Sequence, residues 1–445
     1  MQLFDNVIFK MNNTDIIIIG AGACGLMAAY QLSKAGKRVE VIDARAYTGG
    51  RVHTMHSGDF KIPVETGAEF IHGNKPITLG LLKEFGIKYH KVTGEMRQVS
   101  HDEFKKENNF MEDHQLLEKV LNKLNEDIPV EDFLNTFFKD AKYTHLKNSV
   151  RGFVEGYDAA DISRASALSF KKEWLNEEDD QYRVEGGYSE LMDALVEQCE
   201  KKGCRFRLSS VITKIEWENE NVAAVSETHK RYRASKAIIT IPLGLLQEAS
   251  KRKGTISFVP EIPAKRKAAQ QLGFGGVVKF ILQFSEAFWK TEPSGKLAGR
   301  SLENLGFLFS RAAIPTWWTQ LPNESPVLTG WIAGPGSNKY LAADQDTLLK
   351  EALGSLAFIF HIKETELKKM LTASQVINWS ADPFSRGGYG YEVVNGKSYK
   401  ELLCSPEENT LYFAGEALAT NDSAGTVEAA LASGIETAEK MLKEE

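Results

Sequence analysis

Apolar runs and a helical pattern follow one another between residues 15 and 44 and predict a compact strand–helix–strand unit. Ile16 to Ile19 form a short, entirely apolar run, which is typical of a parallel strand buried on both faces. A helix is predicted from the glycine-rich turn that follows to about Ala35, and Gly36 is suited to end it in a left-handed conformation. The segment RVEVID (38–43) is the second predicted strand. This order indicates an α/β fold.

A later run, GFGGVVKFILQF (273–284), predicts a strand that carries one cation in its middle. Alternation places Val278 and Phe280 on one face, and Val277 and Lys279 on the other. The pattern alone favours a half-solvated strand whose lysine points into water, because unpaired lysines are rarely buried. A lysine that points into a cleft is the alternative.

Three glycines after the first strand carry the most informative motif. Gly20, Gly22 and Gly25 give GxGxxG, in which the missing side chains permit a tight turn, a close approach of pyrophosphate and close packing of helix on sheet. Asp43 ends the next strand, where a carboxylate can accept the hydroxyls of an adenosine ribose. A turn-forming aspartate is the simpler alternative for Asp43. Together these features predict a dinucleotide site.

Size and composition favour a soluble enzyme of two or three domains. The chain has 445 residues, of which 42% are hydrophobic and 26% charged. Its net charge of −6, without a basic block, argues against binding to nucleic acid or to anionic membranes. The four cysteines (Cys24, Cys199, Cys204 and Cys404) form no CxxC and no metal-ligand cluster, so we expect no metal site, reduced thiols and a cytoplasmic location. We find no signal peptide and no apolar run of membrane-spanning length. The oligomeric state stays open.

The stretch after Asp43 indicates which dinucleotide is bound. DARAYTGGRVHT (43–54) continues into Arg45 and then Gly49-Gly50-Arg51, and glycines flanked by arginines suit a loop around a pyrophosphate. This stretch resembles the flavin-containing amine oxidase family, in which the ribose acid is followed by an arginine and a GGR loop. The resemblance implies FAD rather than NAD.

The resemblance continues in order along nearly the whole chain. The similar segments are 64–73, 184–195, 208–217, 237–246, 378–391 and 411–439. In the family, the first passes beside the isoalloxazine ring, the second returns the chain to the FAD domain, and the third holds the adenine with its backbone, here near Val211. The fourth ends in a Pro-Leu-Gly turn, and the last two contact the flavin. The resemblance implies an α/β fold with a Rossmann-like FAD-binding domain interleaved with a substrate domain of mixed β-sheet plus helices. The predicted FAD domain comprises 12–75, 183–263 and 377–445, and the substrate domain comprises the helical-looking 76–182 and the strand-rich 264–376. We expect the cleft at their interface.

The same resemblance assigns the cofactor contacts. Glu416 corresponds to the ribityl–phosphate contact, and the last helix begins near the flavin's pyrimidine edge, where a helix N-terminus suits partial negative charge. Gly388 lies where monoamine oxidases carry the cysteine that bonds to the flavin, so non-covalent FAD is predicted. The predicted cofactor-binding residues are Gly20, Gly22, Ala23, Cys24, Gly25, Asp43, Ala44, Arg45, Gly50, Arg51, Gly67, Ala68, Val211, Gly415, Glu416, Gly425, Thr426 and Val427.

Three residues are predicted to act in catalysis. In the family, Lys279 corresponds to a lysine held through water to flavin N5, where a fixed charge stabilises reduced flavin and the charge that develops on dioxygen. The resemblance therefore favours a Lys279 side chain that points into the cleft over one that points into water. Tyr389 corresponds to one wall of an aromatic cage, with an ordinary packed tyrosine as the alternative. Thr426 stands where monoamine oxidases have a second tyrosine. This departure from the monoamine oxidase pattern resembles polyamine oxidases and histone demethylases instead. Glu69 could pair with the distal ammonium of a polyamine or be structural.

Substrate contacts are predicted for Phe70, His72 and Trp331. Phe70 replaces the arginine with which L-amino-acid oxidases clamp a carboxylate, which favours amines without one. His72 could face the cleft, and Trp331 could line an aromatic pocket with Trp317 and Trp318 or pack in the core. Acidic side chains could steer cations or simply be solvated; they are Glu155, Asp158, Asp161 and the run 176–180.

These features predict an FAD-dependent amine oxidase that transfers hydride from the amine α-carbon to flavin N5, with dioxygen as acceptor and hydrogen peroxide as a product. The single credible dinucleotide motif and the lack of a CxxC argue against NADPH-fed monooxygenases and disulfide reductases. An L-amino-acid oxidase or oxidative decarboxylase of the same family is the first alternative, and a desaturase-like flavoenzyme is another. An FAD-binding scaffold or partner protein is the alternative from a different class.

Overall fold

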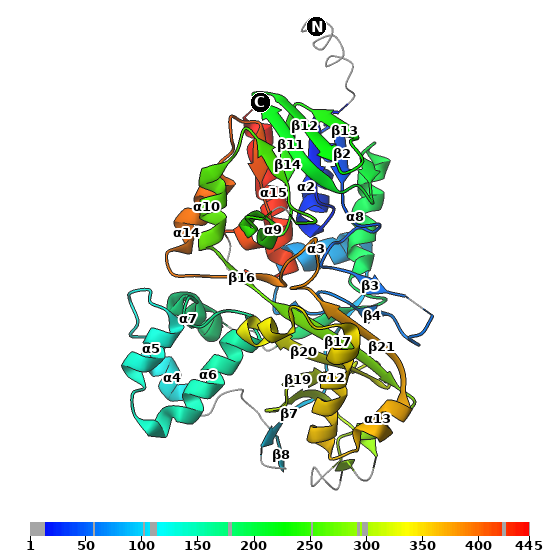
Figure 1. The fold of residues 1–445 in the computed structure, drawn as a ribbon, viewed down its shortest axis with the longest axis vertical. Helices are drawn as coiled ribbons and strands as arrows, with labels where there is room; N and C mark the ends of the chain where they lie inside the picture. Colours follow the sequence, from blue (N-terminus) through cyan, green and yellow to red (C-terminus); the bar gives the residue numbers. More distant parts are fainter. Residues whose placement is uncertain are drawn as a thin grey trace, which may run out of the picture.

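A parallel sheet of five strands forms the centre of the upper half of the molecule in Figure 1. Its order is β10-β2-β1-β14-β23, with every neighbouring pair parallel. The strands are β1 (Ile16–Ile19), β2 (Val39–Ile42), β10 (Arg205–Arg207), β14 (Lys236–Ile239) and β23 (Leu411–Phe413). All four isoleucines of β1 are buried, as their apolar run predicts. The structure is a computed structural model that describes residues 14–56, 58–100, 103–106, 114–176, 180–250, 252–291, 294–295, 301–420 and 424–444.

Helices cover one face of this sheet and a second sheet covers the other. α2 (Ala23–Lys34), α3 (Pro76–Phe85), α8 (Ser189–Lys201) and α15 (Val427–Lys443) share one hydrophobic core with β1 and β2. The opposite core contains a four-stranded sheet and three helices. These elements are β11 (Ile212–Glu218), β12 (Asn221–Ser226), β13 (Arg231–Ala234), β15 (Ser257–Val259), α9 (Leu243–Gln247), α10 (Pro263–Gln271) and α14 (Gly396–Cys404).

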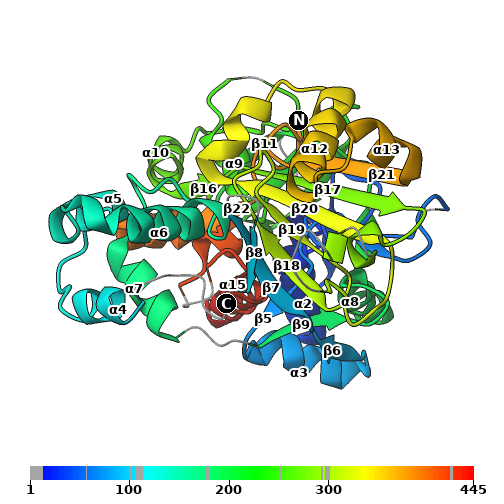
Figure 2. The same cartoon turned by 90° about the horizontal axis from the view of Figure 1, so that it is seen from below.

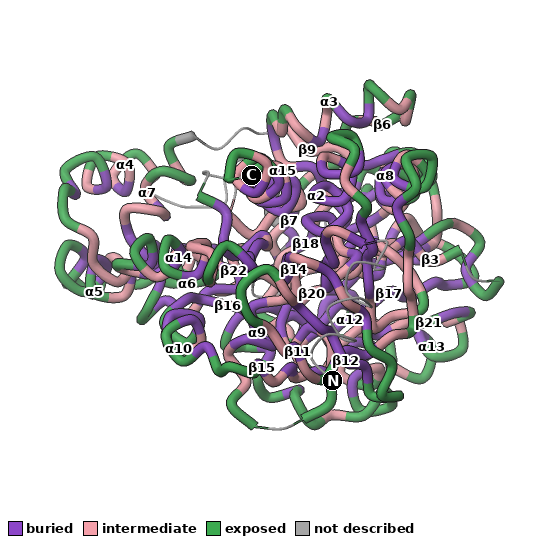
Figure 3. The backbone as a smooth tube through the Cα atoms, turned by 90° about the horizontal axis from the view of Figure 1, so that it is seen from above, coloured by how far each residue is buried: buried purple, intermediate pink, exposed green. Residues whose placement is uncertain are grey.

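A seven-stranded sheet of order β21-β17-β20-β19-β18-β7-β8 dominates the lower half of Figure 1. Its strands are β7 (Glu95–Ser100), β8 (Glu103–Lys106), β17 (Val277–Phe284), β18 (Leu305–Phe309), β19 (Thr316–Trp318), β20 (Val327–Ala333) and β21 (Leu371–Asn378). α12 (Gln345–Phe360) and α13 (Glu364–Met370) pack on it around a second large core. β17 is buried along its whole length, and Figure 3 shows it as part of the buried interior.

Residues 95–100 and 103–106 correct the helical expectation for this part of the chain. They form β7 and β8, and β7 pairs in parallel with β18, some two hundred residues later. Val99 and Phe104 enter the core of the seven-stranded sheet, which accounts for the strand conformation. Helices do form further along, where α4 (His114–Leu121), α5 (Val130–Phe137), α6 (Thr144–Gly156) and α7 (Ala167–Asn176) make a separate cluster. Figures 1 and 2 both show this cluster to one side of the sheet.

Short strands connect the two halves. β16 (Gly273–Gly275) pairs with β22 (Tyr389–Tyr391) just before the chain enters β17. The remaining short elements are β3 (Thr54–Met55), β4 (Val64–Glu65), β5 (Ile71–His72), β6 (Tyr89–Lys91), β9 (Gln181–Val184), η1 (Ala141–Tyr143), η2 (Phe288–Lys290), η3 (Gly334–Tyr340) and η4 (Glu416–Leu418). The chain therefore passes several times between the parallel sheet and the seven-stranded sheet, in agreement with an interleaved α/β fold. The exact domain boundaries stay predictions.

Candidate active site

One cavity of about 1560 Å³ extends from the carboxyl end of β1 to the seven-stranded sheet and the helical cluster. Its position outside the carboxyl ends of β1, β2 and β14 is where α/β sheets of this kind bind ligands. With the exception of Gly25, every residue predicted for the cofactor lines it, and so do Lys279, Tyr389, Glu69, Phe70, His72 and Trp331. The predicted site residues, far apart in sequence, thus meet around one space.

The three glycines of the turn differ in what their missing side chains allow. Gly20 has a φ of +116°, and a Cβ there would lie 2.5 Å from the Thr240 hydroxyl. A Cβ on Gly25 would lie 2.0 Å from the Gly20 carbonyl oxygen, so Gly25 serves the contact of α2 with β1 and not the cavity. At Gly22, the only atom of the described residues within 4 Å of a Cβ, apart from the neighbouring backbone, is the Gly49 oxygen at 3.8 Å. The empty space at Gly22 is therefore available to a ligand.

The Asp43 carboxylate organises the backbone beside this turn. It accepts the Ala21 N–H and the Arg45 N–H, each at 2.7 Å, and the latter bond is the turn expected of an aspartate in this position. Burial raises the pKa of Asp43, against the lowering effect of these two N–H groups and of Arg45. Asp43 lines the cavity, so the turn-forming role and the ribose-binding role are compatible.

Each arginine of the GGR region is fixed by an acid that lies more than three hundred residues away. Arg45 pairs with Asp382 at 2.7 Å, and Arg51 pairs with Glu416 at 2.8 Å and donates to the Gly388 carbonyl at 2.6 Å. Asp382 was not predicted as part of the site, although it lies in one of the segments that resemble the family. These pairs join β2 and the GGR loop to the C-terminal segments.

The last helix presents its N-terminus to the cavity. The Thr426 hydroxyl caps α15 by accepting the Ala429 N–H at 3.2 Å, and Gly425 precedes it with a φ of +74°. Gly388 offers no side chain for a covalent bond, and Cys404 does not line the cavity. Cys24 does line it, but burial raises the pKa of its thiol to about 12, so the nucleophilic thiolate is disfavoured.

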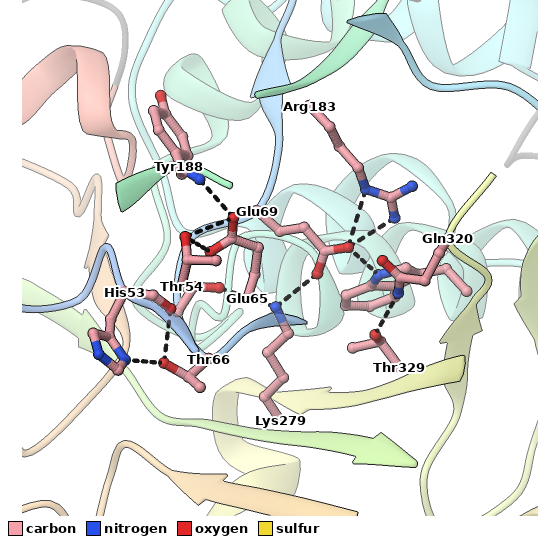
Figure 4. Close-up of polar contacts among 12 residues, drawn as sticks. His53, Thr54, Glu65, Thr66, Glu69, Arg183, Tyr188, Lys279, Gln320 and Thr329 are labelled. Carbon is pink, nitrogen blue, oxygen red and sulfur yellow. Dashed lines mark hydrogen bonds and ion pairs between the residues drawn. The ribbon is translucent and has the colours of Figure 1, made fainter. Parts of the chain in front are cut away.

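Lys279 does not reach solvent. Its side chain is 1% exposed, and its ammonium donates to Glu69 Oε2 at 2.7 Å (Figure 4). The same ammonium donates to the Gly67 carbonyl at 3.0 Å. Arg183 of β9 approaches the same carboxylate from the opposite side, at 2.7 Å and 3.1 Å from Oε1. Burial raises the pKa of Glu69, but the charges of Lys279 and Arg183 outweigh it and the pKa lies below its ordinary value. Arg183 was not predicted from the sequence, because it belongs to no recognisable motif.

Aromatic rings surround the part of the cavity next to Lys279. Tyr389 and Trp331 stack with ring centres 6.4 Å apart and an angle of 18°, and Trp318 lies 6.0 Å from Trp331. The Phe70 ring packs against the rings of Trp318 and His72, with distances between ring centres of 5.6 Å and 5.9 Å. Trp317, by contrast, is fully buried in the core of the sheet. The predicted aromatic pocket therefore contains two of the three tryptophans proposed for it.

His72 and Tyr389 both form hydrogen bonds with Tyr157, the residue that follows α6. The His72 ring nitrogen lies 3.0 Å from the Tyr157 hydroxyl, and the Tyr389 hydroxyl donates to the Tyr157 carbonyl. Burial lowers the pKa of His72 to about 4, so its imidazole is neutral around pH 7. Burial, with Asp158, Glu173 and Glu416 nearby, raises the pKa of Tyr389 well above its usual range. Tyr389 therefore acts as a neutral hydrogen-bonding phenol.

Acidic residues of the helical cluster also border the cavity. Glu155, Asp158 and Glu173 line it, whereas Asp161 does not and instead accepts hydrogen bonds from Ser163. Within the run 176–180, residues 177–179 lie outside the described part of the chain.

The described residues contain no group of three or more His, Cys, Asp or Glu side chains placed to hold a metal ion. In the same part of the chain, no helix is both long and apolar enough to cross a membrane. All four cysteines are free thiols.

Comparison with known proteins identifies relatives along almost the entire chain. A family model described as flavin containing amine oxidoreductase matches residues 23–442. Lysine-specific histone demethylase 1 homolog 2 of Oryza sativa subsp. japonica is 30% identical, over 96% of this chain and 57% of its own length. Polyamine oxidase 4 of the same organism is 28% identical, over 96% of this chain and 88% of its own length. The chain thus spans little more than half of the demethylase relative.

Solved structures agree with the fold. A putrescine oxidase bound to putrescine superimposes with a TM-score of 0.77 at 19% identity, covering 97% of this chain and 99% of that one. Cyclohexylamine oxidase from Brevibacterium oxydans gives a TM-score of 0.76 at 18% identity, with the same coverage. At these identities the likeness establishes the architecture of an α/β dinucleotide-binding domain combined with a second mixed domain.

Proposed function

Because the chain belongs to the flavin-containing amine oxidoreductase family, we propose that it is an FAD-dependent amine oxidase for primary amines or polyamines, with dioxygen as electron acceptor. The observation that carries the proposal is one continuous cavity that joins the GxGxxG turn to an aromatic chamber containing Lys279. One wall can hold a dinucleotide, and the other can hold an apolar or cationic organic substrate.

The residues of the first wall fit FAD. Gly22 leaves room for a pyrophosphate at the N-terminus of α2, and Asp43 lies at the end of β2, where it can accept ribose hydroxyls. Arg51 adds a fixed positive charge that Glu416 keeps in place. The capped N-terminus of α15 suits the negatively polarised edge of the flavin ring. FAD supplies the hydride acceptor when bound, and it binds without a covalent link because Gly388 has no thiol.

The aromatic wall would keep the substrate amine neutral. Trp318, Trp331, Phe70 and Tyr389 line the chamber and would displace water from a bound amine. Desolvation favours the uncharged form of an amine, whose nitrogen lone pair assists the loss of hydride from the adjacent carbon. His72 carries no charge around pH 7 and therefore does not repel the substrate. Lys279 would provide the fixed positive charge next to the site at which dioxygen is reduced.

The charged groups of the cavity favour amines over amino acids. A carboxylate clamp requires an available arginine, but Arg45 and Arg51 are paired with Asp382 and Glu416. Arg311 also lines the cavity, at an exposed position. Asp158 and Glu173 could attract a second ammonium group, which supports diamines or polyamines as substrates, whereas Glu155 is paired with Arg151 at 3.0 Å. The names of polyamine oxidase and putrescine oxidase among the relatives point in the same direction.

The test is a peroxide assay of the FAD-loaded protein across monoamines, diamines, polyamines and amino acids. We expect peroxide with at least one amine that lacks a carboxylate. Turnover of an amino acid but not of its decarboxylated amine would favour the amino-acid oxidase alternative. No turnover by a protein that holds oxidised FAD would favour the scaffold alternative. The four free thiols support a reducing, cytoplasmic setting as part of this proposal.

A further inference from the structure

Glu69 lines the cavity, yet its carboxylate is already occupied by the protein. Oε1 accepts Arg183 Nη2 at 2.7 Å, Arg183 Nε at 3.1 Å and Trp318 Nε1 at 2.9 Å. Oε2 accepts the Lys279 ammonium at 2.7 Å. The residue is only 6% exposed. A carboxylate with four protein donors has little capacity left for a substrate cation.

Arg183 is held rigidly behind this carboxylate. Its guanidinium also donates to the Leu321 carbonyl at 2.8 Å and the Thr319 carbonyl at 3.0 Å, and it lies over the Phe70 ring at 4.7 Å. Arg183 does not line the cavity. Its contacts all lie within the protein interior, so it acts as a fixed support that orients Glu69 towards Lys279.

Lys279 is attached from two sides of its ammonium. Glu69 and the Gly67 carbonyl take two of its three donors, which leaves one N–H for a further partner, and Lys279 lines the cavity. Gly67 lies so close to the backbone of Arg51 that a Cβ would be 1.9 Å from the Arg51 oxygen, and the next residue, Ala68, donates its N–H to that oxygen at 2.9 Å. Both anchors therefore fix the position of the ammonium.

The charges of this cluster also disfavour a second substrate cation. Lys279 and Arg183 contribute two positive charges against one negative charge from Glu69. Among the described residues, Glu65 of β4 also interacts with Lys279, and burial raises its pKa to about 7, while His90 lies next to Arg183. The Lys279 end of the cavity thus repels an ammonium, whereas Asp158 and Glu173 offer negative charge at the helical cluster.

We propose that Glu69 is a positioning residue: supported by Arg183 and Trp318, it anchors the protonated Lys279 beside the flavin and does not bind the distal ammonium of a substrate. The inference rests on the proposed amine oxidation. Without Glu69, the Lys279 ammonium would face the Arg183 guanidinium with no anion between them, which favours the neutral amine and releases its position.

The central experiment compares wild type, Glu69→Gln, Arg183→Met and the double variant, each as the FAD-loaded full chain. We expect Glu69→Gln to slow reoxidation of the photoreduced flavin by dioxygen roughly tenfold. Its reoxidation rate should fall with rising pH across a range in which the wild-type rate is constant, because Lys279 loses its proton. The double variant should regain a large part of the rate and of the flat pH profile, since the repelling cation is gone.

Thermal unfolding provides a readout that does not depend on activity. Glu69→Gln should lower the unfolding midpoint by several degrees, and adding Arg183→Met should cost less than the sum of the two single changes, because the partners act as one unit. Additive losses in the double variant would overturn the inference. Arg183→Met alone should leave the reoxidation rate independent of pH, because the pair between Lys279 and Glu69 remains.

Substrate kinetics separate the two roles of Glu69. If it anchors Lys279, Glu69→Gln leaves the ratio of KM for a diamine to KM for the matching monoamine within twofold of wild type. A rise of about tenfold in that ratio, with unchanged reoxidation, would assign Glu69 to the substrate and refute the proposal. If the wild-type protein oxidises no amine, the proposed function fails, while photoreduction and unfolding still test the anchoring.

Discussion

A methyl group at Gly22 should abolish tight FAD binding without harming the fold. Gly22 has φ −77° and ψ 178°, which alanine adopts freely, and its Cβ would meet only the Gly49 oxygen at 3.8 Å. The methyl would instead occupy cavity space where a pyrophosphate approaches the start of α2. Loss of one or two charge-assisted hydrogen bonds there corresponds to about 2–4 kcal/mol, or roughly 30- to 1000-fold in affinity.

Two matched glycines make this experiment specific. Gly25→Ala would place its Cβ 2.0 Å from the Gly20 carbonyl oxygen, so we expect loss of folded protein. Gly80→Ala lies in the middle of α3, where no atom of the described residues outside the helix backbone comes within 4 Å of the added Cβ, so this variant should bind FAD normally and be slightly more stable. The assay is thermal unfolding of FAD-stripped protein followed by titration with FAD. Wild-type affinity in Gly22→Ala would refute the assignment of this turn to the cofactor.

Two further predictions concern buried charged groups near the chamber. Lys279→Met should slow reoxidation of reduced flavin by dioxygen at least tenfold and change FAD affinity less than twofold. Stopped-flow mixing with dioxygen measures the reoxidation rate, and titration with FAD measures the affinity. Equal reoxidation rates in variant and wild type would count against a role for Lys279. Glu65 has a folded-state pKa of about 7 against an ordinary 4.5, so the folded protein binds the proton more tightly than the unfolded chain does. Its contribution to stability is complete below about pH 4.5 and is lost as the pH rises through 7, which amounts to about 3 kcal/mol. Denaturant unfolding at pH 5 and pH 8 should show this decline in wild type and a smaller one in Glu65→Gln; identical pH dependence would contradict it.

The parallel sheet and its glycine turn could be predicted because their signals are local. Ile16–Ile19, the GxGxxG turn and the strand ending at Asp43 all lie within thirty residues, and each has a backbone or burial requirement that few residue types meet. The strands β7 and β8 were missed for the opposite reason. Their residues are mostly polar, and what makes β7 a strand is its pairing with β18, far along the chain, while β8 pairs with β7.

Lys279 illustrates how tertiary context changes the meaning of a pattern. Alternation in 273–284 suggests one solvated face, but β20 and β21 pair on both edges of β17, and residues 67–69 cover the face that carries Lys279. Its partners come from segments 210 and 212 residues away. Arg183 could not be predicted at all, since a single arginine in a short strand carries no local signal for a buried ion pair.

Anaerobic reduction of the bound flavin by an amine tests the central claim most directly. The FAD-loaded protein is mixed without oxygen with monoamines, a diamine and a polyamine, and the visible absorption of oxidised flavin is followed. We predict that at least one amine bleaches the flavin and that admitting oxygen restores its colour with formation of hydrogen peroxide. Persistent oxidised flavin with every amine, in a protein whose flavin can still be photoreduced, would contradict the assignment as an amine oxidase.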